Sequence, residues 1–403
     1  MYFAGSSLVL LLATHALAAV PAALHQNKAR QATPYAVKEP PLTTPWTDKA
    51  GTDPWPEYPR PQLERSEWKN LNGIWQYQDA QSLAALDSPP FGQPLAHEVL
   101  VPSCLESGLS GKLCQSAWVI AHTHQHTSRY PRERYLIFVV YHAVHCSPVL
   151  QRPERSSELC RVTVTANTAT TSGSPVEVKV YDGDEEVGSG QGTSDQTFDF
   201  VVDGVELWSP DSPKLYNVTV TMGDEEVHSY VGFRTIAKGK VDGVVRPLLN
   251  GEFIFMFGTL DQGYWPDGLY TPPTREAMIK VEPALFYRAC DELGLLVIQD
   301  MPSARPLSRP DPCATSDIIP NASQQEEFSR QLEVLVNQFK SYPSIIAWGW
   351  GQITSYYPEF ELTDRVKELD PSRLVDSTSG WIDHGAGDFS VSEGDHTRSR
   401  YDS

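Results

Sequence analysis

The spacing of the apolar residues changes near residue 238, and this change divides the chain into two kinds of fold. Between residues 161 and 236, apolar and polar residues alternate in short runs separated by turns, as in "RVTVTAN" and "LYNVTVTMG". This pattern predicts a small antiparallel β-sandwich. Beyond residue 238, short apolar runs such as "GLLVIQDM" and "SIIAW" alternate with helical segments. Strands that alternate with helices predict a parallel sheet with right-handed crossovers.

The residues before the sandwich are expected to be β-rich as well. Residues 60–78, "RPQLERSEWKNLNGIWQYQ", place apolar residues around the turn Asn72-Gly73, and residues 99–111 have the pattern of a strand and a loop. Residues 26–58 are rich in Pro, Thr and Ala and predict an extended leader. The 403 residues suffice for two or three domains, so we expect a multidomain chain with β domains followed by an α/β region.

The N-terminal residues predict export. Residues 7–18, "SLVLLLATHALA", form a short apolar run that ends in a small-x-small cleavage pattern. We expect a signal peptide over residues 1–18; the alternative is an N-terminal helix of the fold. The glycosylation sequons that begin at Asn217 and Asn321 agree with a secreted, extracellular glycoprotein. Later apolar runs are shorter than the about 18 residues that a membrane span needs.

The net charge of the chain and the spacing of its histidines limit the kinds of ligand that it can bind. A net charge of −19 argues against nucleic acid and anionic membranes as partners and fits a neutral substrate better. Histidines 122, 124 and 126 alternate and would share one face of a strand, where they could bind zinc. The alternatives are a surface or disordered tract, or sequence foreign to the fold. Because neither a carboxylate nor a cysteine pair completes the set, we assign no metal.

Disulfides are compatible with an exported chain, but their pairing stays open. The six cysteines are Cys104, Cys114, Cys146, Cys160, Cys290 and Cys313.

Several segments together resemble a known family. They are "RPQLERSEWKNLNGIWQY", "LWSPDSPKLY", "VGFRTI", "LLNGEFIFMFGTLDQG", "EPALFYRACDELGLLVIQDMP" and "YPSIIAW". As a set they are similar to glycoside hydrolase family 2, which includes β-galactosidases, β-glucuronidases and β-mannosidases. The resemblance implies a partial jelly-roll sugar-binding domain over residues 59–160 and an immunoglobulin-like domain over residues 161–236. It further implies an incomplete (β/α)₈ TIM-barrel catalytic domain over residues 237–403, after a leader over residues 19–58.

The resemblance also implies retaining hydrolysis of β-glycosides of the β-galactosidase or β-glucuronidase type, with a carbohydrate substrate and without a cofactor. It leaves the sugar and the oligomeric state open. In the family, the fourth barrel strand leads to an Asn-Glu pair whose glutamate is the general acid/base. Here Trp348 is followed directly by Gly349-Trp350-Gly351, so that glutamate is missing.

Other departures agree with this gap. Thr271–Gly294 has room for about one helix, so one β/α unit is missing, and residues 237–403 are fewer than the about 250 of a complete barrel. The strand that would carry the nucleophile is not recognisable; Glu393 is the only glutamate in the polar C-terminal tail. We therefore expect no catalytic residue in this chain, and an inactive product.

Side chains that follow the barrel strands remain candidates for substrate binding. They are Asp261, Trp265, Asp300, Trp350 and Trp381. The tryptophans could stack on sugar rings or pack in the barrel top. Asp261 and Asp300, with Asp376, could form a surrogate catalytic pair, orient substrate hydroxyls or cap helices.

Three hypotheses account for the gaps. The first is a gene model that lacks coding segments of an active hydrolase, the second a truncated carbohydrate-binding remnant, and the third a product that does not fold. The abrupt junctions at Trp348/Gly349 and Met278/Ile279, with family-like sequence on both sides, favour the first.

Overall fold

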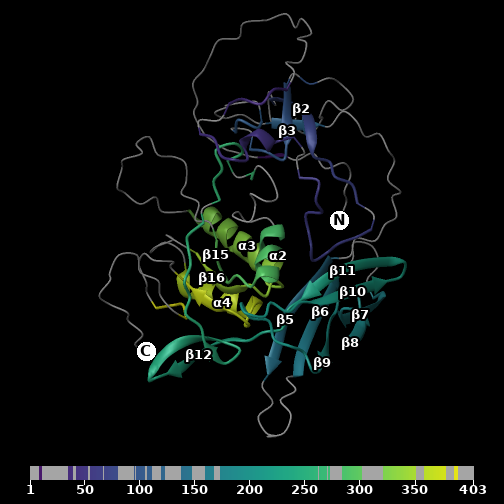
Figure 1. The fold of residues 1–403 in the computed structure, drawn as a ribbon, viewed down its shortest axis with the longest axis vertical. Helices are drawn as coiled ribbons and strands as arrows, with labels where there is room; N and C mark the ends of the chain where they lie inside the picture. Colours follow the sequence, from purple (N-terminus) through teal and green to yellow (C-terminus); the bar gives the residue numbers. More distant parts are fainter. Residues whose placement is uncertain are drawn as a thin grey trace, which may run out of the picture. The chain divides into compact units, whose positions relative to one another are not determined.

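The structure of the chain is a computed structural model with two compact units (Figure 1). Unit 1 comprises Met1–Tyr58, Trp68–Glu133 and Leu260–Glu282, and unit 2 comprises Pro59–Glu67, Arg134–Thr259 and Pro283–Ser403. The structure describes residues 9–10, 35–39, 42–52, 55–66, 68–79, 95, 97–104, 107–110, 119–122, 138–147, 159–167, 173–261, 263–269, 271–272, 284–301, 321–350, 358–377 and 385–388.

Unit 1 contains a four-stranded antiparallel sheet in the order β1-β4-β2-β3. Its strands are β1 (Val9–Leu10), β4 (Val119–His122), β2 (Gly73–Asp79) and β3 (His97–Val101). The short 3-10 helix η1 (Thr47–Lys49) lies in the segment predicted as a leader. Ala50, at the end of that helix, packs with Leu100 and Leu109 in a small apolar core. Part of the predicted leader is therefore packed against the sheet.

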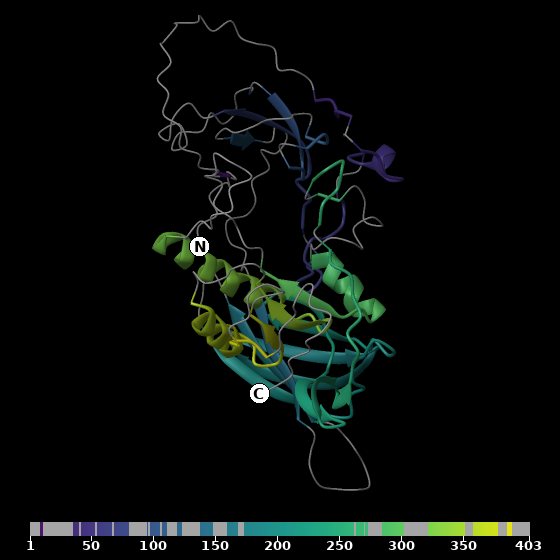
Figure 2. The same ribbon diagram turned by 90° about the vertical axis from the view of Figure 1, so that its left-hand side faces the viewer.

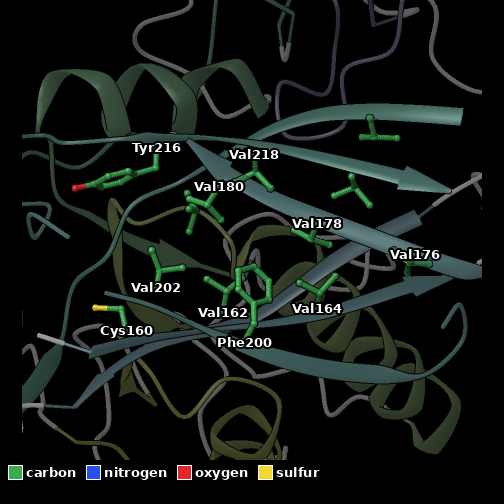
Figure 3. Close-up of a cluster of buried hydrophobic side chains, with 14 of the residues drawn as sticks. Cys160, Val162, Val164, Val176, Val178, Val180, Phe200, Val202, Tyr216 and Val218 are labelled. Carbon is green, nitrogen blue, oxygen red and sulfur yellow. The ribbon is translucent and has the colours of Figure 1, made fainter. Parts of the chain in front are cut away.

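Unit 2 contains a sandwich of two antiparallel sheets, as the alternating pattern predicts, but the sandwich starts earlier than the predicted residue 161 because β5 belongs to it. One sheet has the order β11-β10-β7-β8 and the other β5-β6-β9. The strands are β5 (Phe138–Ser147), β6 (Leu159–Asn167), β7 (Pro175–Asp182), β8 (Glu185–Thr193), β9 (Thr197–Val202), β10 (Tyr216–Met222) and β11 (Glu225–Val231). Every second residue of β7 and β10 is buried, and Figure 3 shows Val178 and Val218 among the side chains between the sheets. Cys160 on β6 is disulfide-bonded, and Cys146 on β5 lies opposite it in register.

The inner face of β8 consists of glycines. A Cβ atom built on Gly188, Gly190 or Gly192 would lie 2.8, 2.3 or 2.1 Å from a side chain of β9. The nearest atoms belong to Val202, Phe200 and Phe198, respectively. Real Cβ atoms do not approach other atoms so closely, so these positions accept only glycine without movement of β9. The three glycines of β8 leave the space that the Val202, Phe200 and Phe198 side chains of β9 occupy.

After the sandwich, a small antiparallel sheet leads into the β/α region. It consists of β12 (Ile236–Val241), β13 (Val244–Leu249) and β14 (Glu252–Phe253). The β/α region contains α2 (Ala284–Leu293), β15 (Val297–Asp300), α3 (Ala322–Phe339), β16 (Ile345–Gly349), α4 (Glu359–Leu369) and β17 (Leu374–Asp376). Its three described strands pair in parallel in the order β15-β16-β17, which confirms the prediction of a parallel sheet.

The helices cover one face of this parallel sheet. Leu332 of α3 and Val366 of α4 belong to one buried cluster with Tyr287 of α2, and Trp348 and Val375 of the strands complete it. In Figure 2 the three helices, green to yellow, lie above the teal strands of the sandwich. Helix α3 begins after the N-cap residue Asn321, whose side chain accepts a hydrogen bond from the Gln324 N–H at 3.0 Å.

A buried polar network joins the sandwich to the start of β16. Arg234, just after β11, donates hydrogen bonds to the carbonyl oxygens of Pro343 at 2.7 Å and Ile345 at 2.6 Å. Arg373, just before β17, donates to the same Ile345 oxygen at 2.7 Å and to Asp370 Oδ2 at 2.7 Å. Burial, together with the nearby Arg373 charge, lowers the pKa of Arg234 to about 9. The sandwich thereby fixes where β16 begins.

Candidate active site

The carboxyl ends of the three parallel strands place two aspartates on either side of a glycine. Asp300 of β15 pairs in register with Gly349 of β16, and Gly349 pairs with Asp376 of β17. In open and closed parallel sheets, ligands bind at this end of the strands. The three residues therefore form the candidate site that the described part of the β/α region offers.

The row of Asp300, Gly349 and Asp376 faces away from the helices. One residue earlier, Gln299 of β15 accepts a hydrogen bond from the Tyr287 hydroxyl of α2 at 2.5 Å, so that row faces the helices. Successive side chains of a strand point to opposite faces, so the next row points the other way. That orientation is the one that the interior of a barrel requires.

The spacing does not favour a retaining carboxylate pair. Asp300 and Asp376 are separated by two strand spacings, so their backbones lie about 10 Å apart. A retaining glycosidase needs its two carboxyl groups about 5–5.5 Å apart. Gly349, which lies between them, has no side chain, and the segment Ile345–Gly349 contains no carboxylate. The surrogate pair of Asp300 and Asp376 thus stays a prediction without support from the register.

A third acid lies at the same end of the sheet. Glu359 is the first residue of α4, and its Oε1 accepts a hydrogen bond from the Ser377 hydroxyl at 2.6 Å. Glu359 is 8% exposed and Ser377, directly after β17, is 2% exposed. The sequence alone did not indicate this pair, because Glu359 lies well beyond the end of β16 in the chain and no motif marks it. An acid in the first turn of the helix after a barrel strand is the signal that could have found it.

The other predicted site residues are distributed over the molecule. Asp261 and Trp265 lie in unit 1, and the Asp261 Oδ1 accepts a hydrogen bond from the Gly263 N–H at 2.9 Å. Trp350 is 1% exposed and packs in the cluster under the helices. Trp381 lies outside the described residues. The structure therefore brings together Asp300 with Asp376, while a role of Trp350 in stacking stays a prediction.

The described residues offer neither a metal-binding cluster nor a membrane-spanning helix. His122 ends β4, whereas His124 and His126 lie outside the described residues. Within the residues that the structure describes, no group of three or more His, Cys, Asp or Glu side chains could hold a metal ion. Over the same residues, no helix has both the length and the apolar character to span a bilayer.

Two family models match parts of the chain. The model of "Glycosyl hydrolases family 2" matches residues 149–234, which include the sandwich strands β6 to β11 but not β5. The model of "Glycosyl hydrolases family 2, TIM barrel domain" matches residues 282–394, which cover the parallel sheet and its helices. Two segments of the chain match glycosyl hydrolases family 2. The predicted resemblance is thereby confirmed, and the described strands and helices of the β/α region match the family's TIM-barrel domain.

Curated relatives match the chain only in part. A protein of Formosa agariphila named "Putative beta-glucuronidase" is 26% identical over 197 residues, which are 43% of this chain and 18% of that protein. The beta-galactosidase of Psychromonas ingrahamii is 24% identical over 212 residues, which are 46% of this chain and 19% of the relative. The chain therefore matches about a fifth of the length of these relatives.

Solved structures agree on the fold. The beta-glucuronidase of an uncultured Clostridium sp. superposes with a TM-score of 0.54 at 14% identity, covering 82% of this chain and 75% of that one. An FMN-binding beta-glucuronidase from Facaelibacterium prausnitzii gives a TM-score of 0.51 at 16% identity, covering 81% and 61%. Together with the family matches, these neighbours support a β-rich multidomain fold with a TIM-barrel region.

Proposed function

We propose that this chain carries the scaffold of a retaining β-glycoside hydrolase of the β-glucuronidase or β-galactosidase type, and that the 403-residue chain is itself inactive. One observation carries the second half of the proposal. Strand β16 runs from Trp348 into Gly349 and Trp350 without the glutamate that acts as general acid/base in the family. A retaining mechanism without its acid/base cannot protonate the leaving group.

The finer domain assignment belongs to the same proposal. The four-stranded sheet of unit 1 is part of a jelly-roll domain, the sandwich of unit 2 is immunoglobulin-like, and the parallel sheet is one section of a (β/α)₈ barrel. The Asp300, Gly349 and Asp376 row then lines the barrel interior, where a β-glycoside substrate binds. The names of the relatives support a carbohydrate as the ligand.

We propose further that the active enzyme is the product of a longer message. Strand β16 is buried along its whole length, and α4 and β17 follow it in the order that a barrel requires. A barrel that had lost its catalytic centre by drift would not be expected to keep this packing intact up to the junction. The carbohydrate-binding remnant is the rival reading.

The expected result is that the purified 403-residue chain does not hydrolyse aryl β-glucuronides or aryl β-galactosides above the buffer rate. Reads of the mature message are expected to contain in-frame codons for an Asn-Glu pair between Trp348 and Gly349 and to run on past Ser390 to a second catalytic glutamate. The protein made from that message is expected to be active. Both assays use the same substrates, so the short and long products are directly comparable.

Two outcomes would contradict this. Turnover by the short chain that disappears in Asp300→Asn, Asp376→Asn or Glu359→Gln would show that the acids at the end of the sheet do catalyse. A message that joins the Trp348 and Gly349 codons directly would contradict the proposal that this gene encodes an active hydrolase. The carbohydrate-binding remnant would then be the favoured hypothesis.

Export is also proposed. Asn217 is exposed on β10, and Asn321 is exposed at the start of α3, so both sequons are accessible on the folded chain. The cap of α3 uses the Asn321 oxygen, whereas an N-glycan would attach to the amide nitrogen. Secreted material is expected to begin near Ala19 and to lose mass on enzymatic deglycosylation. Mature protein that retains Met1 would contradict the proposal.

A further inference from the structure

The last strand of the small antiparallel sheet in unit 2 lies at an edge of that sheet. The strand order is β12-β13-β14, so β14 pairs with β13 on one side and leaves its other side open. Just beyond β14, the Ile254 N–H donates to the Pro247 carbonyl at 3.3 Å, which continues the pairing by one residue. Among the residues that the structure describes, no hydrogen bond joins Phe255, Met256 or Phe257 to another part of the chain. An open strand edge of this kind can pair with a further strand.

The side chains along this edge are apolar and open to solvent. Phe253, Phe255 and Phe257 are 40%, 75% and 89% exposed, whereas Ile254 and Met256 between them are half-buried. This alternation continues the period of two of a β-strand, so the three rings lie on one face. Residues 253–260, "FIFMFGTL", contain neither a charged residue nor a proline, which are the residues that commonly protect open edges. We call residues 253–257 the Phe255 edge.

The opposite edge of the same sheet is protected. It is formed by β12, in which Lys238 and Lys240 are both exposed. The Lys238 ammonium also makes an ion pair with Asp388 at 3.2 Å. Lysines on an edge strand disfavour pairing with another sheet, because their charges would have to leave water. The sheet therefore has one edge that is open to pairing and one that is not.

The pairing of β14 with β13 determines which main-chain groups point outward. The Ile254 N–H bonds to β13, so the main-chain groups of the even-numbered residues face that strand. In an antiparallel ladder, the residues between them direct their N–H and C=O groups to the other side. The outward groups are thus those of Phe253, Phe255 and Phe257. Two copies of the edge related by a two-fold axis at Phe255 place Phe255 opposite itself and Phe253 opposite Phe257, and each of these pairs can exchange both hydrogen bonds.

The area and the charge of the Phe255 edge fit a second copy of itself. Together the three rings expose about as much surface as two whole phenylalanine side chains, about 400 Å² per copy. Two copies can therefore bury up to about 800 Å² of ring surface, besides the main-chain hydrogen bonds, which is the range of weak and reversible complexes. Cross-strand aromatic pairs stabilise antiparallel sheets, and an edge without charge meets no repulsion from its own copy. The pairing uses up the open edge of each copy and leaves the lysines of β12 outside, so assembly stops at two copies.

We infer that the Phe255 edge pairs antiparallel with the Phe255 edge of a second copy of this chain. The result is a symmetric dimer in which the two small sheets form one continuous sheet, with the phenylalanine rings of both copies packed on the same face. The surface includes none of the acids at the end of the parallel sheet. The inference therefore does not depend on the proposed hydrolase function.

Sedimentation equilibrium of the full chain tests this pairing. The buffer contains about 0.15 M salt, because the net charge of −19 on each copy opposes association and has to be screened. A reversible monomer–dimer equilibrium is expected, with a Kd in the micromolar range. Phe255→Lys places two ammonium groups opposite each other and is expected to raise that Kd at least about tenfold. Val244→Lys is the matched control, because Val244 is 38% exposed in the same sheet but lies at the hairpin end of β13; this variant is expected to dimerise like the parent.

A mixing experiment tests the position of the two-fold axis. Phe255→Glu is expected to be monomeric for the same reason as Phe255→Lys. In an equimolar mixture of the two variants the introduced carboxylate faces the introduced ammonium, so a heterodimer is expected. A parent chain that stays monomeric up to about 100 µM, equal dimerisation of the parent and Phe255→Lys, or a mixture that stays monomeric would overturn the inference. Assembly of the parent into particles larger than a dimer would overturn it as well, because β12 would then not close the sheet.

Discussion

Replacing Arg234 with methionine is expected to lower the free energy of unfolding by about 3–5 kcal/mol. Arg234 is 5% exposed, and its guanidinium donates to the carbonyl oxygens of Pro343, Ile345 and Ser372. Methionine fills a similar volume but removes the hydrogen bonds from Arg234 to all three carbonyls, of which the Ile345 oxygen keeps its hydrogen bond from Arg373. Each buried, unmet acceptor costs about 1–3 kcal/mol. Chemical denaturation followed by tryptophan fluorescence measures the loss.

Arg365 provides the matched control for this change. Its guanidinium makes ion pairs with Glu333 at 2.8 Å and Glu368 at 3.1 Å, but all three side chains are exposed. Arg365→Met is therefore expected to cost less than about 1 kcal/mol. Equal losses for the two substitutions would show that the contacts of Arg234 with the start of β16 contribute no more than surface ion pairs.

Asp291 is expected to make stability depend on pH. Burial raises the pKa of Asp291 to about 7, although hydrogen bonds from the Ser344 N–H at 2.8 Å and the Tyr230 hydroxyl at 2.9 Å act in the opposite direction. The ordinary value of 3.8 applies to the unfolded chain, so between about pH 4 and pH 7 the folded protein binds a proton that the unfolded chain does not. This stabilisation is present at low pH and is lost as the pH rises through about 7.

The size of the Asp291 effect is about 4 kcal/mol, since each pKa unit corresponds to about 1.4 kcal/mol. Asp370, which is buried, and Asp388, which is half-buried, act the other way: burial raises the pKa of each, but ion pairs and hydrogen bonds outweigh it and lower both pKa values. The informative quantity is therefore the difference between the parent chain and Asp291→Asn, measured by denaturation at pH 4.5 and pH 8. We expect the advantage of the parent over Asp291→Asn to shrink toward the higher pH. A difference that is constant with pH would contradict the assignment.

The sequence predicted the parts of the fold whose pattern is local. Alternation in β7 and β10 indicated which residues face the sandwich core, and these residues are buried. The parallel pairing of β15 with β16 also followed from the alternation of strands and helices. In each case the deciding interaction lies between residues that are close in the chain or repeat at a regular period.

The residues that escaped prediction depend on contacts between distant segments. Arg234 binds carbonyl groups more than 100 residues away, and carbonyl acceptors leave no mark in a sequence. Asp261 was grouped with Asp300 because both follow apolar runs, yet the two lie in different compact units.

The glycines on the inner face of β8 determine how this strand can vary. Every missense change in a glycine codon introduces a larger residue, so inherited variation at Gly188, Gly190 and Gly192 always adds atoms where β9 leaves no room. Ser189 and Gln191, between them, are exposed and free of that limit. Missense alleles should therefore be rarer at the three glycines than at the two residues between them, so that their frequency along β8 alternates with a period of two residues.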